Sequence, residues 1–103
     1  MTVEYKTDYI ASRSGNAFIE TISVDTQQRL GWAITALADW LIYYLPGTRT
    51  LYRVPLVNIR ANLPRWIATY RSQAIPNDGY ATHGILVPLE VFAQCAEEIV
   101  VLG

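Results

Sequence analysis

The longest run of hydrophobic residues lies between Asp25 and Pro46 and reads DTQQRLGWAITALADWLIYYLP. Its aliphatic residues recur at steps of three and four positions, the spacing of one face of an α-helix. These residues are Leu30, Ile34, Leu37, Leu41 and Leu45. Asp25 is a suitable N-cap, Gln28 can complete a capping box, and Pro46 cannot continue the pattern. We therefore predict a long buried helix over residues 25–46.

A second flank of this predicted helix is aromatic, since Trp32, Trp40 and Tyr43 recur at similar steps. Tryptophan and tyrosine concentrate binding energy at protein interfaces, so these three residues are candidate interface aromatics. A place in the core explains them equally well. We also expect Trp32, Leu37 and Leu41 to be buried, so that Leu37→Ala would cost about 2–5 kcal/mol of stability.

The chain before this run alternates between apolar and polar positions. Residues 2–12 have the pattern of a half-buried strand, and Ser14-Gly15-Asn16 has the composition of a turn. Residues 17–24 are rich in β-branched and aromatic residues, which favour a strand. The three segments together predict an N-terminal β-hairpin.

After the run, residues 49–54 and 80–87 are predicted strands, and residues 76–79 (PNDG) are a strong turn signal. Pro64 argues against one continuous helix from 56 to 73, because an interior proline costs about 3 kcal/mol. We therefore predict a helix over residues 64–73.

A last helix is predicted to begin at Pro88, which is tolerated in a first helical turn. Its apolar stripe comprises Leu89, Phe92, Ala93, Ala96 and Val100. The resulting order of elements predicts an α+β fold in one compact domain over residues 1–103. In this fold a small, mostly antiparallel sheet, made of the N-terminal hairpin and one or two further strands, packs against the long central helix and two shorter helices.

Composition narrows the class of protein. The formal net charge is −1, which argues against a globally basic nucleic-acid binder. Cys95 is the single cysteine, so no internal disulfide can form, as is usual in a reducing cytosol. The polar N-terminus does not resemble a signal peptide, and the apolar run is too short for a comfortable membrane span. We predict a cytoplasmic protein with no membrane partner.

Few residues suit catalysis or metal binding. One histidine, His83, and one cysteine, Cys95, cannot form a zinc site in one chain, and the glycines do not form a phosphate loop. We therefore assign no catalytic residue, no metal and no cofactor. His83 could act as a general base with Asp78, Tyr80 or Cys95 nearby, so a small enzyme with a pocket around His83 stays an open alternative.

Charge placement gives the main functional hypothesis. Five of the eight basic residues are arginines between positions 49 and 71, and no acidic residue occurs from Trp40 through Asn77. Arginine forms forked contacts with carboxylates and phosphates and stacks on aromatic rings. The candidate partner-binding residues are Arg49, Arg53, Arg60, Arg65, Trp66 and Arg71. The alternative is that these arginines pair within the chain, with Glu90, Glu97 and Glu98.

We therefore expect a small binding or regulatory protein without enzymatic activity, such as an inhibitor or adaptor of a bacterium or a mobile element. It would engage a protein partner through its arginine and aromatic surface, and it could form a homodimer. A nucleic-acid-binding regulator that uses the Arg49–Arg71 segment is the alternative function.

Overall fold

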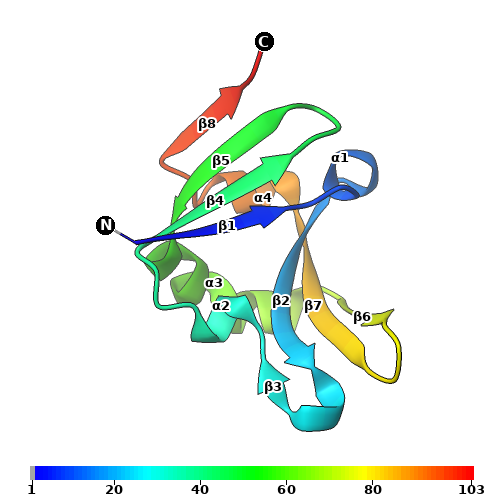
Figure 1. Ribbon diagram of the computed structural model, residues 1–103. Coiled ribbons are helices and arrows are strands. Elements are labelled where there is room, and N and C mark those ends of the chain that lie inside the picture. The colour runs from blue at the N-terminus through cyan, green and yellow to red at the C-terminus, as the bar shows by residue number, and fades with distance from the viewer. Residues whose placement is uncertain (1) are drawn as a thin grey trace.

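The computed structural model describes residues 2–103, which form two four-stranded sheets packed with four α-helices (Figure 1). Sheet A has the strand order β1-β4-β5-β8, and sheet B has the order β3-β2-β7-β6. The predicted α+β class, with mostly antiparallel strands and one longer helix, is confirmed. No helix within residues 2–103 is both long and apolar enough to cross a bilayer.

Sheet A contains β1 (Val3–Thr7), β4 (Trp40–Leu45), β5 (Thr50–Pro55) and β8 (Glu98–Val101). β1 runs parallel to β4, whereas the β4–β5 and β5–β8 pairs are antiparallel. Alternate residues of β4 and β5 point into the core, as the period of two in a strand requires. The buried ones are Leu41, Tyr43, Leu45, Tyr52 and Val54.

Sheet B contains β2 (Asn16–Val24), β3 (Arg29–Leu30), β6 (Ser72–Pro76) and β7 (Ala81–Pro88), all antiparallel. The predicted turn between β6 and β7 is confirmed, because the Asn77 amide donates to the Tyr80 carbonyl at 2.8 Å. Gly79 has φ of +81° there, a left-handed conformation that glycine adopts without strain.

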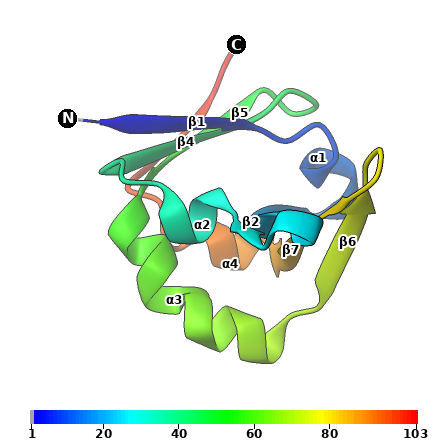
Figure 2. The ribbon, with the colours of Figure 1, turned by 60° about the horizontal axis from the view of Figure 1, so that its bottom comes forward.

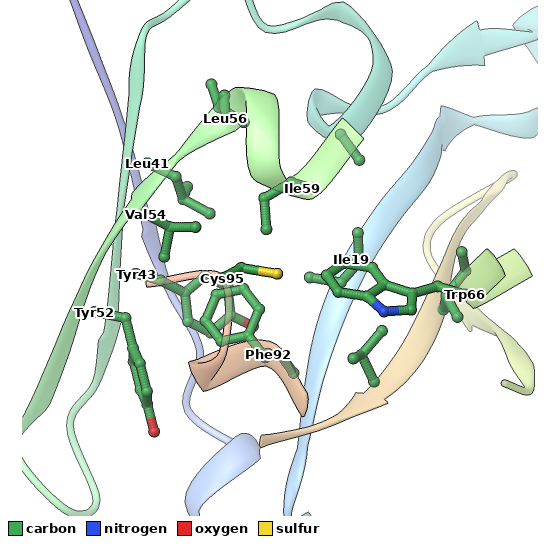
Figure 3. Packing of buried hydrophobic residues seen from close by; sticks show 14 of the residues in the cluster. Ile19, Leu41, Tyr43, Tyr52, Val54, Leu56, Ile59, Trp66, Phe92 and Cys95 are labelled. Atoms are coloured by element: carbon green, nitrogen blue, oxygen red, sulfur yellow. The ribbon is translucent and has the colours of Figure 1, made fainter. Parts of the chain in front are cut away.

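The helices are α1 (Ala11–Ser14), α2 (Trp32–Thr35), α3 (Leu56–Thr69) and α4 (Leu89–Ala93). Phe92 of α4 lies in the core, with its ring 4.9 Å from Tyr43 and 5.4 Å from Tyr52, between ring centroids (Figure 3). The two sheets and α3 therefore share one core, with α4 at its centre.

The predicted helix over residues 25–46 is wrong. The segment forms a 3₁₀ turn (Asp25–Gln27), β3, the four-residue α2 and β4, and Leu37 is 94% exposed. The cause is the continuous apolar run in β4, which satisfies a period of two as well as a helical period. Its β-branched and aromatic residues favour the strand. The predicted burial of Trp32 and Leu41 is confirmed, but that of Leu37 is wrong.

The predicted N-terminal hairpin is also wrong, although both of its strands exist. β1 pairs with β4 and β2 pairs with β7, so the two strands belong to different sheets. The four-residue α1 separates them and turns the chain from sheet A into sheet B. A strand pattern predicts the strand itself but not its partner.

The predicted break at Pro64 does not occur, because α3 continues from Leu56 to Thr69. Pro64 is exposed, while the opposite side of α3 buries Leu56, Ile59, Leu63 and Trp66. Burial of four large side chains outweighs the roughly 3 kcal/mol cost of an interior proline.

The predicted last helix is shorter than expected. It ends at Ala93, and the chain then returns to sheet A as β8, which contains Val100. The β-branched residues at 99–101 explain this preference for a strand.

Candidate functional site

The outward side chains of sheet A form the candidate site, which we call the outer face. Paired residues in neighbouring strands lie on the same side of a sheet, so the register defines this face. It comprises Val3, Tyr5, Thr7, Trp40, Ile42, Tyr44, Leu51, Arg53, Pro55, Glu98 and Val100. Most of these side chains are apolar, and Tyr5 is 70% exposed.

Within residues 2–103, no helix packs against the outer face. Helices α2, α3 and α4 and sheet B all lie on the other side of sheet A (Figure 2). In a two-layer arrangement a sheet commonly buries one face and presents a polar face to water. The outer face departs from that pattern, because aromatic and aliphatic residues occupy the positions where polar residues are usual.

Arg53 is the central charged residue of the outer face. Its Cζ atom lies 4.5 Å from the centroid of the Trp40 ring, which is a cation–π distance. Its Nε atom lies 3.4 Å from Glu98 Oε1 on the neighbouring strand. Both contacts come from the strand register, which places Arg53 opposite Ile42 on one side and Glu98 on the other.

A hollow of about 440 Å³ adjoins the outer face at the Trp40 end. Its lining includes Leu37, Trp40, Val57, Arg60 and Glu97. Leu37 and Val57 are exposed there, and the Arg60 guanidinium donates to the carbonyl of Ala36. The hollow therefore extends the apolar surface beyond the sheet and adds one cation, Arg60, and two carboxylates, Asp39 and Glu97, at its rim.

The structure does not bring the predicted arginines onto one surface. Arg49 lies in the β4–β5 turn, at the opposite end of β5 from Pro55. Arg60 lies in the first half of α3, whereas Arg71 lies beyond the other end of this helix, just before β6. Only Arg53 and Arg60 of the five approach Trp40, through the stacking contact and the shared hollow.

The arginines are also mostly unpaired with carboxylates. Arg53 pairs with Glu98, and no other arginine forms an ion pair with a carboxylate within residues 2–103. The internal pairing considered as an alternative is therefore limited to this one pair.

Two of the predicted site aromatics lie in the core instead of on a binding surface. Trp66 is 1% exposed and Trp32 is 7% exposed, because α3 and α2 turn these rings toward the sheets. The Trp66 indole Nε1 has no hydrogen-bond partner among the residues that the structure describes. Neither ring can reach a partner in this conformation, so the prediction of Trp66 as a contact residue is corrected.

Tyr43 is also a core residue, and its hydroxyl is part of an internal network. The hydroxyl donates to Asp8 Oδ2 and accepts from the Phe18 amide at 3.1 Å. Asp8 Oδ1 accepts from the amides of Ile10 and Ala11 at 3.0 and 2.9 Å. Burial, together with the Asp8 carboxylate, raises the pKa of Tyr43 far above its usual value. The network ties β4 to α1 and β2.

A second hollow, of about 340 Å³, is polar and lies between α3 and α4. Its walls include Asn58, Asn62, Arg65 and Cys95, and the Asn58 side chain donates to the Cys95 carbonyl at 3.0 Å. Burial raises the pKa of the Cys95 thiol, which opposes formation of the reactive thiolate. This arrangement favours a structural cysteine.

His83 lies on β7 beside a residue that the sequence did not single out as its neighbour. Its Nε2 atom is 3.1 Å from Asp25 Oδ2, and Asp25 Oδ1 accepts from the Ala81 amide at 2.9 Å. The pair links the 3₁₀ turn to sheet B, and neither of the two hollows includes it. This geometry is that of a brace between two segments.

No protein-family model, curated protein or solved structure matches this chain in the three comparisons made.

Several outer-face residues are missing from the predicted site. They are Tyr5, Ile42, Tyr44, Leu51 and Val100. Of these five, the apolar side of the alternation in residues 2–12 could have found only Tyr5. That side turns outward, while Glu4 and Lys6 pair with Leu41 and Tyr43 on the inner side.

Proposed function

We propose that this protein acts by binding another protein through the outer face of sheet A. The observation that carries the proposal is a four-stranded sheet whose uncovered face is apolar and aromatic. Four strands about 4.8 Å apart and about five residues long cover roughly 300 Å² in projection. Contiguous exposed apolar patches of this size commonly mark interaction sites.

The chemistry of the outer face supports a protein partner. Trp40 and Tyr5 offer large, partly exposed rings, and Arg53 is held by stacking and by Glu98. Interfaces are enriched in tryptophan, tyrosine and arginine at their energetic centres. A nucleic-acid partner would call for basic residues in one stripe, whereas these arginines are dispersed and the net charge is −1.

A regulatory, inhibitory or adaptor role without catalysis belongs to this proposal, as does a cytoplasmic location. The proposal of a role without catalysis is supported by the buried Cys95 and by His83, which is paired with Asp25. Neither side chain lines a substrate-sized apolar pocket. The proposed cytoplasmic location is supported by Cys95, which is a single free thiol.

The test is a double variant on the outer face, Tyr5→Thr with Ile42→Thr, because these residues are direct neighbours in the β1–β4 register. Threonine keeps strand propensity and removes most of the apolar surface. The matched control is Ile75→Thr, which makes the same change at an exposed position of β6 in sheet B.

Wild type, the double variant and Ile75→Thr are each immobilised and incubated with a cell lysate, and the partner proteins that each one captures are compared. Melting curves of the three proteins are recorded in parallel. We expect the double variant to lose the captured protein while it still melts cooperatively, and Ile75→Thr to retain it. Capture that is unchanged in the folded double variant would refute the proposal. Capture that disappears after nuclease treatment would support the alternative of a nucleic-acid-binding regulator. Loss of function in a folded His83→Ala variant would support the alternative of a small enzyme with a pocket around His83.

A further inference from the structure

Two open sheets leave four free strand edges, and three of these are protected against pairing. β3 is only two residues long, and β6 ends at Pro76, which has no amide hydrogen. β1 carries Glu4 and Lys6 on its inner side. Short strands, prolines and inward-pointing charges are the devices by which proteins prevent association at sheet edges.

The edge strand β8 lacks these devices along most of its length. Residues 99–102 read IVVL, and Val101 is 68% exposed. Val100 lies on the outer side of sheet A, whereas Ile99 and Val101 lie on the inner side. An exposed apolar edge strand is a template for pairing with a further strand. β8 therefore has the composition of an edge that can take a second neighbour.

The backbone of β8 has free hydrogen-bonding groups at this edge. The Leu102 amide donates to the Arg49 carbonyl at 2.8 Å, in line with the β5–β8 register. Backbone groups of successive residues in an antiparallel strand point to opposite sides. The amides and carbonyls of Ile99 and Val101 consequently face away from β5.

We propose that a second copy of this chain pairs its own β8 with this edge, antiparallel and about a twofold axis through Val100. In this register Ile99 faces Val101 of the second copy, so both residues use their outward backbone groups. The axis is perpendicular to the sheet, so the outer side of β8 in one copy and the outer side of β8 in the second copy face the same way. The product is one continuous eight-stranded sheet whose two outer faces lie on the same side.

The charge pattern favours a second copy as the occupant. Glu98 would face Leu102 of the second copy, and the two Glu98 residues would lie about 14 Å apart, at four residues of strand rise. No like charges meet, and the Arg53–Glu98 pair within each copy stays intact. An unrelated acidic strand would instead meet Glu97 and Glu98 at the start of β8. The proposal does not depend on the function proposed for the outer face.

Two edge variants test this dimer. Val101→Lys places a charge on the exposed edge, and Val101→Pro removes the outward amide while it leaves the ladder to β5 in place. Val57→Lys, at an exposed position of α3, is the matched control for added charge.

Sedimentation measures the molar mass between about 10 and about 500 µM, since a small interface gives a weak dimer. We expect wild type and Val57→Lys to rise from 11.6 kDa toward twice that mass, and both edge variants to stay at 11.6 kDa. A wild type that is monomeric at the highest concentration, or a dimer that persists in the folded edge variants, would overturn the proposal. Tyr5→Thr with Ile42→Thr should still dimerise, which separates this outcome from that of the outer-face experiment.

Discussion

Sheets A and B use their polar residues differently. In sheet B, side chains bridge neighbouring segments: Thr82 Oγ1 donates to the Ser23 carbonyl at 2.9 Å, and Asp25 contacts Ala81 and His83. On the outer face of sheet A, the one ion pair between strands within residues 2–103 is Arg53–Glu98. Sheet B thus satisfies its polar groups internally, while sheet A presents apolar surface.

The comparison shows how two sheets of the same size can have different roles. Side-chain hydrogen bonds between its segments add to the stability that sheet B gains from Ile19 and Val87 in the shared core. The Phe18 ring also covers Gly84, since a Cβ atom there would lie 2.5 Å from the ring. Sheet A is stabilised by its inner side, where Leu41 and Val54 are fully buried, so its outer side is free for binding.

The largest expected effect tests the inner side of sheet A. Leu41→Ala should lower the free energy of unfolding by about 2–5 kcal/mol, because it leaves a cavity among fully buried neighbours. Leu37→Ala is the matched control and should change it by less than about 0.5 kcal/mol, because Leu37 is exposed. Urea titration measures both. Equal effects would mean that Leu41 is not a core residue of sheet A.

An intermediate effect is expected for the network that joins sheet A to sheet B. Tyr43→Phe should cost about 1–3 kcal/mol, because it deprives Asp8 and the Phe18 amide of a buried partner. Tyr44→Phe removes the neighbouring hydroxyl on the outer face and should have little effect. Thermal unfolding of the two variants distinguishes them, and similar melting temperatures would exclude a stabilising role for the Tyr43 hydroxyl.

The smallest expected effect concerns pH and sheet B. The Ala81 amide and then His83 lower the pKa of Asp25 in the folded protein. Its carboxylate therefore stabilises the fold above the unfolded value of about 3.9, and this contribution is lost as pH falls through the folded value. Asp25→Asn should flatten the loss of stability as the pH falls below about 4.

Urea titrations at a series of pH values measure this slope. Asp78→Asn is the control, because Asp78 is exposed in the turn between β6 and β7. A slope for Asp25→Asn equal to that of wild type would mean that the brace contributes nothing to acid sensitivity.

Local patterns predicted two strands of each sheet. Alternation or β-branched composition identified β1, β2, β5 and β7, and the PNDG turn was correctly placed. The run that contains β4 was misassigned, because six consecutive apolar residues fit a buried helix and a strand alike. The pairing of β1 with β4 depends on contacts between distant segments, which no local pattern encodes.

The candidate site was predictable only in its composition. Trp40 and Arg53 were singled out by residue type, and the structure places them in contact. Their contact arises from the β4–β5 register, which a predicted helix could not provide. Trp66 and Tyr43 have the same residue types as interface aromatics, and only the three-dimensional packing shows that they are buried.

The parallel pairing of β1 with β4 has a consequence for how the chain folds. Val3 pairs with Trp40, and Asn16 pairs with Pro88, so both sheets need contacts between residues far apart in sequence. Closing such long loops costs entropy before any contact compensates, which slows folding to milliseconds or longer. The β4–β5 hairpin, closed between Leu45 and Thr50, is the most local pairing in sheet A. We expect it to form first and to template the addition of β1 and β8.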